Sequence, residues 1–496
     1  MTWLPGLLQA IVFLPLAGVV LVPLLSKGRP QAAKWIALAV SLAGLVMTVL
    51  LVAGFDRGAA GMQATTDVLW VAQAGIHYHL GVDGISITML ALSSLLGVIA
   101  VIASWKITER APMYFAMLLL LQVGMNGVFV ALDFVLFYVF WELVLVPMFF
   151  LIGMWGGARR DYASVKFFIY TLAGSVFMLI GIIALYLSAG TFDMVELARL
   201  ASTGAFGFGF QMWVFLAFFL GFAVKVPVWP LHTWLPDAHV EAPTAASVLL
   251  AGILLKMGTY GFIRVSLPML PQASMAWAPW ISVLAAISII YGAAVAFAQT
   301  DLKKLVAYSS VSHMGFVMLG IFSLTAAGLN GAVAVMFSHG VVTGMLFLIV
   351  GIVYDRAHTR EISKIGGLSK AMPVTGGLLA FAAFASLGLP GLSGFVGEFL
   401  SLVGSWQSAY IPKAVTVLAA VGVLLAAAYT LWMVLRVVLG KPTETVEGLP
   451  DASPREIGML APLIALTLVV GVSWSSLLSF VDPAVKALVA VVTKAA

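Results

Sequence analysis

Residues 211–243 read QMWVFLAFFLGFAVKVPVWPLHTWLPDAHVEAP and carry the strongest architectural signal in the chain. The stretch begins as an apolar run and then places one lysine, Lys225, directly before Pro227 and Pro230. Each proline removes a backbone donor and clashes with the preceding helical turn. A helix broken inside a bilayer is tolerated only where its unpaired backbone groups face protein or a water-filled cavity. The stretch therefore predicts an interrupted transmembrane helix with a cation at its break.

The composition of the whole chain supports a membrane environment. Of 496 residues, 62% are hydrophobic and 9% are charged, with a mean hydropathy of +1.11. Soluble domains carry about 25% charged residues, so a soluble globular fold is excluded. Cysteine is absent, which excludes disulfides, thiolate zinc sites and cysteine-bound iron–sulfur clusters. The basic residues are scattered and do not form blocks, which argues against binding to nucleic acid.

Apolar stretches long enough to cross a bilayer recur along the entire chain. A spanning helix needs roughly 20 apolar residues, and we expect about fourteen such spans in an all-α integral membrane protein. The first has no basic leader or cleavage site and is expected to be retained. The expected spans are 3–25, 32–54, 85–105, 112–131, 133–153, 166–188, 211–231, 243–263, 276–297, 304–323, 330–352, 374–402, 413–438 and 457–480.

The basic residues also predict an orientation. Most of the 25 Lys and Arg residues lie in the odd-numbered loops between these spans. Loops rich in Lys and Arg stay in the cytoplasm. We therefore expect both termini on the outer, periplasmic side of a bacterial inner membrane.

Glu142 and Lys225 are ionisable residues inside predicted spans. Such groups are costly in a bilayer and usually mark ion or proton paths. Glu142 has no basic partner three or four residues away, so another helix must meet its charge, unless it is a structural residue bonded to neighbouring backbone. Lys225 lies at a helix end, where carbonyl groups attract a cation. The alternative for Lys225 is a side chain that extends to the membrane surface.

Lys256 and the loop before its helix make a second group of polar residues. Lys256 lies in mid-span near Gly252 and Gly258, which leave room for close helix approach. The preceding loop concentrates ligand-type residues, so a metal site is conceivable there. A hydrogen-bonded turn is the favoured interpretation, and no metal is expected. The loop residues concerned are His232, Asp237, His239 and Glu241.

His313 and His339 also lie within spans, in the second half of the chain. Histidine titrates near neutral pH, and hydroxyl groups such as that of Ser309 accompany it. A proton relay is the favoured role. Haem ligation and a purely structural role remain as alternatives.

A second interruption is predicted at residues 387–399, LGLPGLSGFVGEF. Four or more glycines with one proline cannot continue a regular helix. Glu398 follows this break, and we expect Gly391, Gly394 and Gly397 to leave space for ordered water beside it. The alternative is that Glu398 only caps the broken helix. Two interrupted helices, one in each half, are typical of transporters built from inverted repeats.

Several of these stretches together resemble the antiporter-like membrane subunits of respiratory complex I. The stretches are residues 141–142, 225–227, 230–239, 301–315 and 389–398. Within that group the chain is most similar to the subunit M or NADH dehydrogenase subunit 4 family of NADH-quinone oxidoreductase. Glu398 favours this branch, because the two sibling subunits carry lysine there.

The resemblance implies a fold and a set of roles. It implies fourteen transmembrane helices, with N-terminal helices at 1–111, inverted five-helix repeats at 112–265 and 276–438, and a C-terminal helix and tail at 439–496. Glu142 and Lys225 would form an input pair, Lys256 a central relay, and His313 and His339 a bridge to Glu398.

The resemblance also implies an activity and its partners. The chain would translocate protons while other subunits reduce quinone, and it would itself hold no NADH, flavin, iron–sulfur cluster or quinone. Its partners would be the other membrane-arm subunits, including the sibling antiporter-like chains, and the lipid bilayer. The alternatives are a subunit of a multisubunit Na⁺/H⁺ antiporter and a subunit of an energy-converting hydrogenase.

Overall fold

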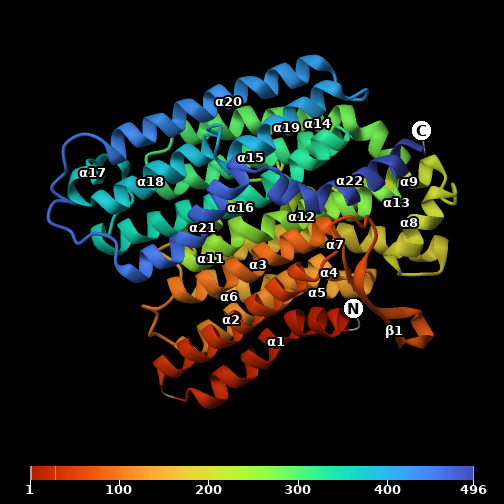
Figure 1. Cartoon of the computed structure of the whole chain (residues 1–496), viewed down its shortest axis with the longest axis horizontal. Helices are drawn as coiled ribbons and strands as arrows, with labels where there is room; N and C mark the ends of the chain where they lie inside the picture. The colour runs from red at the N-terminus through yellow and green to blue at the C-terminus, as the bar shows by residue number, and fades with distance from the viewer. Residues whose placement is uncertain (1–2, 28, 495–496) are drawn as a thin grey trace. The chain divides into compact units, whose positions relative to one another are not determined.

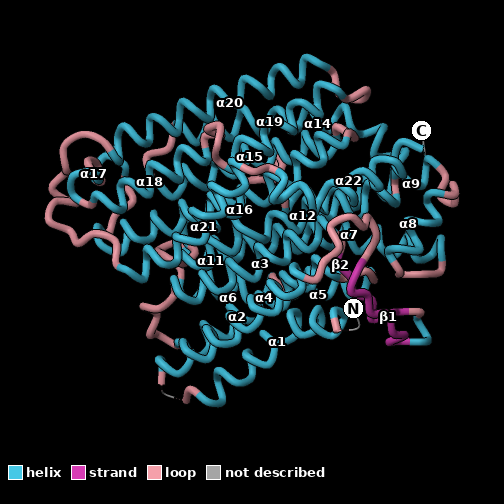
Figure 2. The backbone as a smooth tube through the Cα atoms, viewed as in Figure 1, coloured by secondary structure: helices cyan, strands magenta, loops and turns pink. Residues whose placement is uncertain are grey.

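The computed structural model describes residues 3–27 and 29–494 of the chain. Helices dominate it, and Figure 2 shows strand structure in a single hairpin. Within the described ranges, fourteen helices are long and apolar enough to cross a membrane. The prediction of an all-α integral membrane protein is confirmed.

The chain divides into two compact units, and the first contains residues 1–226, 253–278 and 479–496. Its long helices pack side by side, and the hairpin of strands β1 and β2 lies outside the spans (Figure 1). The elements of this unit are α1 (Leu4–Leu25), α2 (Pro30–Ala53), β1 (Gln63–Val71), a short 3-10 turn (Ala72–Ala74), β2 (Ile76–Val82), α3 (Gly84–Ala103), α4 (Ala111–Val130), α5 (Phe134–Leu143), α6 (Leu145–Trp155), α7 (Arg160–Ala189), α8 (Met194–Ser202), α9 (Phe208–Lys225), α12 (Leu255–Gly261), a π-helical segment (Phe262–Ser266) and α13 (Leu267–Met269).

The second unit contains residues 227–252 and 279–478. Its elements are α10 (Trp234–Glu241), α11 (Thr244–Leu249), the start of a π-helical segment (Leu250–Leu254), most of α14 (Pro271–Phe297), α15 (Leu302–Phe322), α16 (Ala326–Ala357), a 3-10 turn (Ile362–Lys364), α17 (Leu368–Ala371), α18 (Pro373–Ser386), α19 (Ser393–Gln407), α20 (Lys413–Met433), a second π-helical segment (Val434–Val438) and α21 (Pro454–Val472), followed by α22 (Ser475–Lys494), which runs into the first unit.

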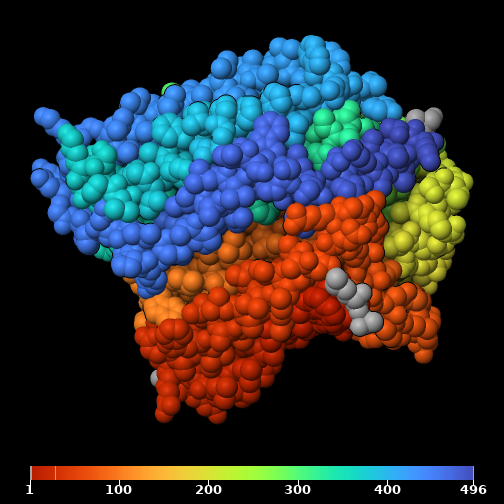
Figure 3. Space-filling view, in the orientation of Figure 1, coloured from red at the N-terminus to blue at the C-terminus, as the bar shows by residue number. Residues whose placement is uncertain are grey.

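Helix burial places the core of the second unit at α15 and α16. The most apolar window of α16 is entirely buried, and that of α15 is almost entirely buried. The corresponding windows of α20 and α21 are 39% buried, and Figure 3 shows both helices at the surface. These two helices therefore lie at the periphery of the unit.

The spans agree with the predicted set except at two places, residues 374–402 and the C-terminal end. The predicted span 374–402 is the interrupted pair α18 and α19, and neither half reaches the length of a full span. The predicted tail is instead the helix α22. Asp482 and Lys486 lowered the apparent apolarity of this segment, but they form an ion pair of 2.7 Å one turn apart. The expectation of one C-terminal helix and a tail was therefore wrong.

Both predicted interruptions are present. The first separates Lys225, the last residue of α9, from Trp234, the first of α10; the second separates Ser386 from Ser393. A third interruption at Val144, between α5 and α6, was not predicted. Pro147 explains it, because its ring clashes with the carbonyl four residues earlier, that of Leu143.

A repeated backbone pattern occurs once in each unit. Asp133 caps α5 and Asp301 caps α15, each accepting two backbone N–H bonds, and each residue forms an isolated β-bridge to another acid. Those partners are Asp193 and Glu361. Asp301 lies 168 residues after Asp133, and Glu361 lies 168 residues after Asp193. The flanking hydrogen bonds follow the same spacing: Phe134 N–H to Phe192 O and Met194 N–H to Leu132 O in the first unit, Leu302 N–H to Arg360 O and Ile362 N–H to Thr300 O in the second.

The compact units do not follow the predicted repeat boundaries. Residues 227–252 pack with the second unit, so the expected first repeat, 112–265, is divided between the two. The division falls within the first interrupted helix and within the span that carries Lys256.

Candidate functional site

The six predicted site residues fall into two groups, one in each unit. Lys225 and Lys256 are buried in the first unit, where Glu142 is half-buried. His313, His339 and Glu398 are buried in the second unit. Five of the six lie in helices long enough to span a membrane, and Glu398 lies in α19, the second half of the interrupted helix.

Glu142 and Lys225 lie at two helix ends of the first unit. Glu142 is in the last turn of α5, beside the break at Val144, and Lys225 ends α9. Within the described part of the chain, no ion pair joins them, and Lys225 Nζ and Glu142 Oε1 are buried without a hydrogen-bond partner. Their charges still interact electrostatically. The two residues are therefore not bonded to each other here, and the expected input pair stays a prediction.

Trp141, the residue directly before Glu142, lies close to the ammonium group of Lys225. The Nζ of Lys225 lies 5.3 Å from the centre of the Trp141 ring, within range of a cation–π interaction. Trp141 is fully buried and packs against the ring of Phe222 at 5.6 Å. The aromatic face therefore holds the ammonium group while it is not bonded to Glu142.

Small residues bring the helices around Lys225 close together. A Cβ on Gly221 would lie 3.0 Å from the carbonyl oxygen of Gly174, where α9 crosses α7. A Cβ on Gly258 would lie 2.8 Å from the carbonyl oxygen of Phe222 and 2.7 Å from a methyl group of Val226. These close approaches exclude larger side chains and pack the start of α12, with Lys256, against the end of α9.

Lys256 lies between two π-helical segments of one span. It is the second residue of α12, directly after Leu250–Leu254 and before Phe262–Ser266. Such segments are rare and frequently occur at functional sites. A regular helix was expected here, and the two π-helical segments were not predicted.

Arg264 anchors the helix that carries Lys256, a role that the sequence analysis missed. It was assigned to a loop, whereas it lies in the second π-helical segment and is inside the span. Its guanidinium bonds Asp83 at 2.5 Å and the Tyr260 hydroxyl at 3.0 Å. Tyr260 in turn donates to the carbonyl of Phe129 at 3.0 Å. Asp83 could have been noticed in the sequence as the cap at the start of α3. Its bond to Arg264 could not, because the two residues are 181 positions apart.

His313 and Glu398 form a direct contact in the second unit. His313 Nδ1 lies 2.9 Å from Glu398 Oε1, and His313 Nε2 lies 3.2 Å from Ser386 Oγ. The ring of His339 packs edge-to-face on that of His313, with centres 5.6 Å apart. Ser386 is a further member of the site that the sequence analysis did not single out.

A small cavity lies among these side chains. Its volume is about 10 Å³, and its lining includes His313, His339, Thr343, Ser386 and Glu398. A volume of roughly 10–15 Å³ admits one water molecule when polar partners surround it. The site therefore has room for a single bridging water between two imidazoles and a carboxylate.

Of the three glycines expected to leave space near Glu398, Gly391 has open space around it, but Gly394 and Gly397 do not. A Cβ on Gly394 would meet the carbonyl oxygen of Ala385 at 2.1 Å, and one on Gly397 would meet the amide nitrogen of Val335 at 2.5 Å. These two glycines allow close backbone packing instead. Gly388, at φ +80°, lies beside the carboxylate, and its Cβ would be 3.0 Å from Glu398 Oε2.

Two cations hold the carbonyl end of the short helix after the first break. Lys303 Nζ donates to the carbonyl of Ala242 at 2.6 Å, and Arg360 donates to that of Val240 at 2.7 Å. A cation is favourable at the C-terminus of a helix such as α10. Lys303 was assigned to a loop, and the structure buries it.

The comparisons with known proteins agree on one family. Residues 131–426 match the family described as NADH:quinone oxidoreductase/Mrp antiporter, transmembrane. The chain is 47% identical to NADH-quinone oxidoreductase subunit M of Rhodobacter capsulatus, over 98% of this chain and 96% of that protein.

Solved structures give the same result. A chain of respiratory complex I from Thermus thermophilus is 30% identical, with a TM-score of 0.88 over 98% of this chain and 99% of that one. A chain of the Mrp complex from a Dietzia species has a TM-score of 0.83 over 98% of both chains; at 23% identity it is alike in fold. The chain belongs to the subunit M, or chain 4, family of the antiporter-like membrane subunits of NADH-quinone oxidoreductase.

Proposed function

We propose that this chain translocates protons in the membrane arm of NADH-quinone oxidoreductase, through its buried Glu, Lys and His residues. The observation that carries the proposal is the contact of His313 with Glu398 beside a water-sized cavity in the core of the second unit. Buried ionisable groups inside membrane spans are costly and usually serve an ion or proton path. The family match gives that path its setting in the complex.

The open Glu142–Lys225 pair supports a mechanism for the input side. When Glu142 pairs with Lys225, the carboxylate favours the protonated lysine. When the pair opens, the ammonium group keeps only the Trp141 ring as a partner, and it releases its proton more readily toward Lys256. Moving one charge against 100 mV takes about 2.3 kcal/mol. A change of a few units in the pKa of one buried group is of that order, because each pKa unit corresponds to about 1.36 kcal/mol.

The repeated cap pattern supports two inverted repeats at 112–265 and 276–438. Asp133 and Asp301 occupy equivalent positions 168 residues apart, each bridged to an acid from the loop after the next long helix. Five spans separate the two positions, from Phe134–Trp155 to Pro271–Phe297. An odd number of crossings puts the two caps on opposite faces of the membrane, as inverted repeats require.

The remaining assignments follow from the family and the composition. Cysteine is absent, and the role requires no redox centre in this chain, so NADH, flavin, iron–sulfur clusters and quinone belong to other subunits. The setting is a bacterial inner membrane, with odd-numbered loops inside and the N-terminus on the periplasmic side. The antiporter alternative has less support, because at 23% identity the likeness to the Mrp chain concerns the fold alone.

A relay variant tests the proposal. His313→Ala removes the contact to Glu398, and we expect NADH-driven proton pumping and quinone reduction in membrane vesicles to fall together. NADH oxidation by a soluble artificial acceptor should not change, because it bypasses the membrane arm. His358→Asn is the matched control, since His358 lies at a helix end in a left-handed conformation that asparagine tolerates. Normal pumping by His313→Ala would overturn the proposal.

A further inference from the structure

We propose that Asp67, His79 and Asp193 form a binding site for Zn²⁺ or a similar first-row divalent cation. The site is separate from the buried residues of the proton path, and the sequence analysis expected no metal. It would join the β1–β2 hairpin to the loop that precedes α8.

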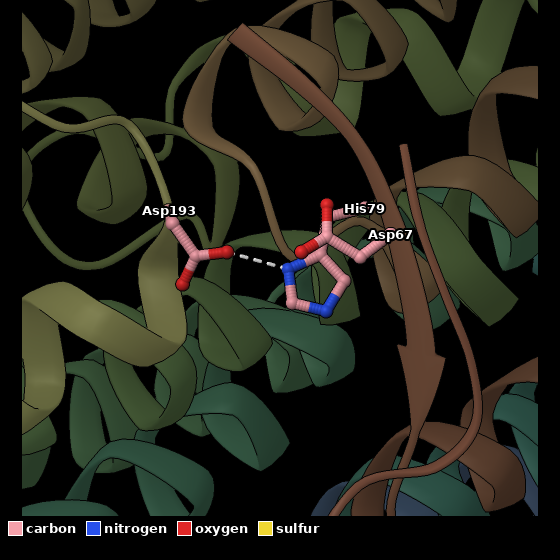
Figure 4. Close-up of side chains that lie close together, drawn as sticks. All are labelled: Asp67, His79 and Asp193. Atoms are coloured by element: carbon pink, nitrogen blue, oxygen red, sulfur yellow. Dashed lines mark hydrogen bonds and ion pairs between the residues drawn. The ribbon is translucent and has the colours of Figure 1, made fainter. Parts of the chain in front are cut away.

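The three side chains converge from two chain segments (Figure 4). His79 Nδ1 lies 2.5 Å from Asp193 Oδ2. Asp67 is the direct cross-strand partner of His79 in the antiparallel hairpin. Its carboxylate lies near the same imidazole in Figure 4, and it pairs with the ring of His77, whose Nδ1 is 2.6 Å from Asp67 Oδ1. One ligand atom from each residue lies within 4.8 Å of the other two. This spacing lets a single ion contact all three after small side-chain rotations.

The backbone holds these ligands in place. His79 O accepts a hydrogen bond from Leu132 N at 2.9 Å, and Leu132 O accepts one from Met194 N at 2.8 Å. The hairpin, the turn before α5 and the loop before α8 are thereby tied side by side. Asp193 is fixed further, because its Oδ1 caps α8 by accepting the Glu196 N–H at 2.7 Å. Ligands on a fixed frame lower the cost of ordering a metal site.

The local charge favours a divalent cation. Asp133 is fully buried beside the site and accepts the His77 N–H through its Oδ2 at 3.0 Å. Across the described chain, no Lys or Arg forms an ion pair with Asp67, Asp133 or Asp193. Asp67 and Asp193 pair with the imidazoles of His77 and His79, and Asp133 accepts backbone N–H groups. The site therefore holds three carboxylates and two imidazoles, and a bound divalent ion would reduce this negative excess.

The ligand types select the kind of ion. One imidazole nitrogen and two carboxylate oxygens suit Zn²⁺ and its neighbours, which bind such atoms at about 2.0–2.2 Å. Mg²⁺ and Ca²⁺ prefer six or more oxygen ligands, and this site offers fewer. The Asp67 side chain is half exposed, so the fourth position opens to water. An ion therefore reaches the site from solution and exchanges with it.

All of the ligand segments lie on one face of the membrane. The hairpin follows the second span, the Asp133 turn follows the fourth, and the Asp193 loop follows the sixth. Even numbers of crossings separate them. In the proposed orientation this face is the periplasmic one, where an exchangeable cation has free access to the hairpin.

Cobalt binding to the purified full chain in detergent tests the site. We expect one equivalent of Co²⁺ to give the visible d–d absorption of a low-coordinate site, and Zn²⁺ to displace it. Excess Mg²⁺ should not displace it. His79→Gln and Asp67→Asn should each weaken binding at least about tenfold, since even outer-shell changes weaken metal sites by ~10–100-fold. Asp67→Asn is the safer variant, because its exposed side chain contributes little to folding.

The controls separate a built site from random surface binding. His358→Asn removes a histidine elsewhere and should leave Co²⁺ binding unchanged; circular dichroism checks that each variant keeps its helices. Zn²⁺ should also slow hydrogen exchange of residues 76–82 in the wild-type chain but not in His79→Gln. Equal Co²⁺ binding by the wild type, His79→Gln and Asp67→Asn would overturn the proposal, as would the absence of a saturable spectrum.

Discussion

His313 Nδ1 lies 2.9 Å from Glu398 Oε1, across 85 residues of sequence. The other nitrogen of the same imidazole lies 3.2 Å from Ser386, the last residue of α18. Glu398 belongs to α19, so one side chain of α15 contacts both halves of the interrupted helix. A proton can pass between imidazole and carboxylate along this bond without movement of heavier atoms. His313 thereby contacts a carboxylate on one side of the break and a hydroxyl group on the other.

Glu142→Gln should leave the complex assembled and remove most coupled proton pumping and quinone reduction. Glutamine keeps the volume of the side chain but cannot offer Lys225 a charge, so the pair cannot close. Glu142→Asp should retain partial activity, because the charge survives with a shorter reach. Pumping is measured as NADH-driven acidification of inverted vesicles. The control is Val146→Ala on the same span, where the side chain is exposed. Near-normal activity of Glu142→Gln would show that the open pair is a structural detail.

Lys225→Ala and Lys256→Ala should both impair turnover, and arginine at either position should not fully restore it. Arginine keeps the positive charge but cannot be deprotonated in proteins, so it can hold a pair and cannot pass a proton. Vesicle pumping rates of the Ala and Arg variants are compared with those of Lys370→Arg, an exposed residue of the short helix α17. If arginine at Lys256 pumps as fast as lysine, then Lys256 has a structural role and the relay takes another course.

Asp451→Ala should lower the stability of the protein near neutral pH, and the difference should disappear in acid. Asp451 accepts N–H bonds from Val374 at 2.7 Å and Thr375 at 3.0 Å, and so caps α18 from a distant loop. Burial alone would raise the pKa of Asp451, but the hydrogen bonds from the Thr375 hydroxyl and the backbone amides hold it below its ordinary value. Loss of a helix cap costs roughly 0.5–2 kcal/mol.

The pH dependence of this effect has a definite sign. A carboxyl whose pKa is lowered by folding stabilises the protein above its unfolded pKa, about 3.9. That contribution is lost as the pH falls through the folded value. Thermal unfolding in detergent from pH 7 to the acid range measures it, with Glu447→Ala, exposed on the same loop, as the control. An equal difference between wild type and Asp451→Ala at all pH values would contradict the charge-based explanation.

The sequence predicted the features that arise from local chemistry. Pro227 with Pro230, and the glycines around Pro390, disfavour a continuous helix through their local backbone chemistry, so both interruptions were foreseen with the charges beside them. Glu142, Lys225 and Lys256 could be identified because a charge inside an apolar run is conspicuous. The family resemblance added an expected order for these groups, which no local pattern contains and which stays a prediction.

The features that the sequence did not reveal depend on distant partners. The bond of Arg264 to Asp83 joins residues 181 positions apart, and nothing near Arg264 distinguishes it from a loop residue. The π-helical segment Phe262–Ser266 contacts α9, and no pattern near Lys256 reveals this partner. Gly394 and Gly397 were taken to open space, whereas neighbouring backbone fills it. Asp67, His79 and Asp193 lie close together because β1 pairs with β2 and the loop before α8 packs beside this hairpin.

Glu398 gives the sharpest test of the relay, because its carboxylate contacts His313 and not the free amides that begin α19. Glu398→Ala should reduce pumping at least about tenfold, the lower end of what a positioned proton-transfer group contributes. Glu398→Gln keeps the shape and a hydrogen bond to His313 but cannot titrate, so it should pump no better than alanine. Glu398→Lys should be tolerated better than alanine, since lysine restores a group that gains and loses a proton. Gln407→Ala, exposed at the end of the same helix, controls for assembly. Pumping and quinone reduction are measured together for each variant in vesicles with equal amounts of complex. Full activity with glutamine would mean that Glu398 only holds the interrupted helix together, and the proton would then have to leave His313 by another group.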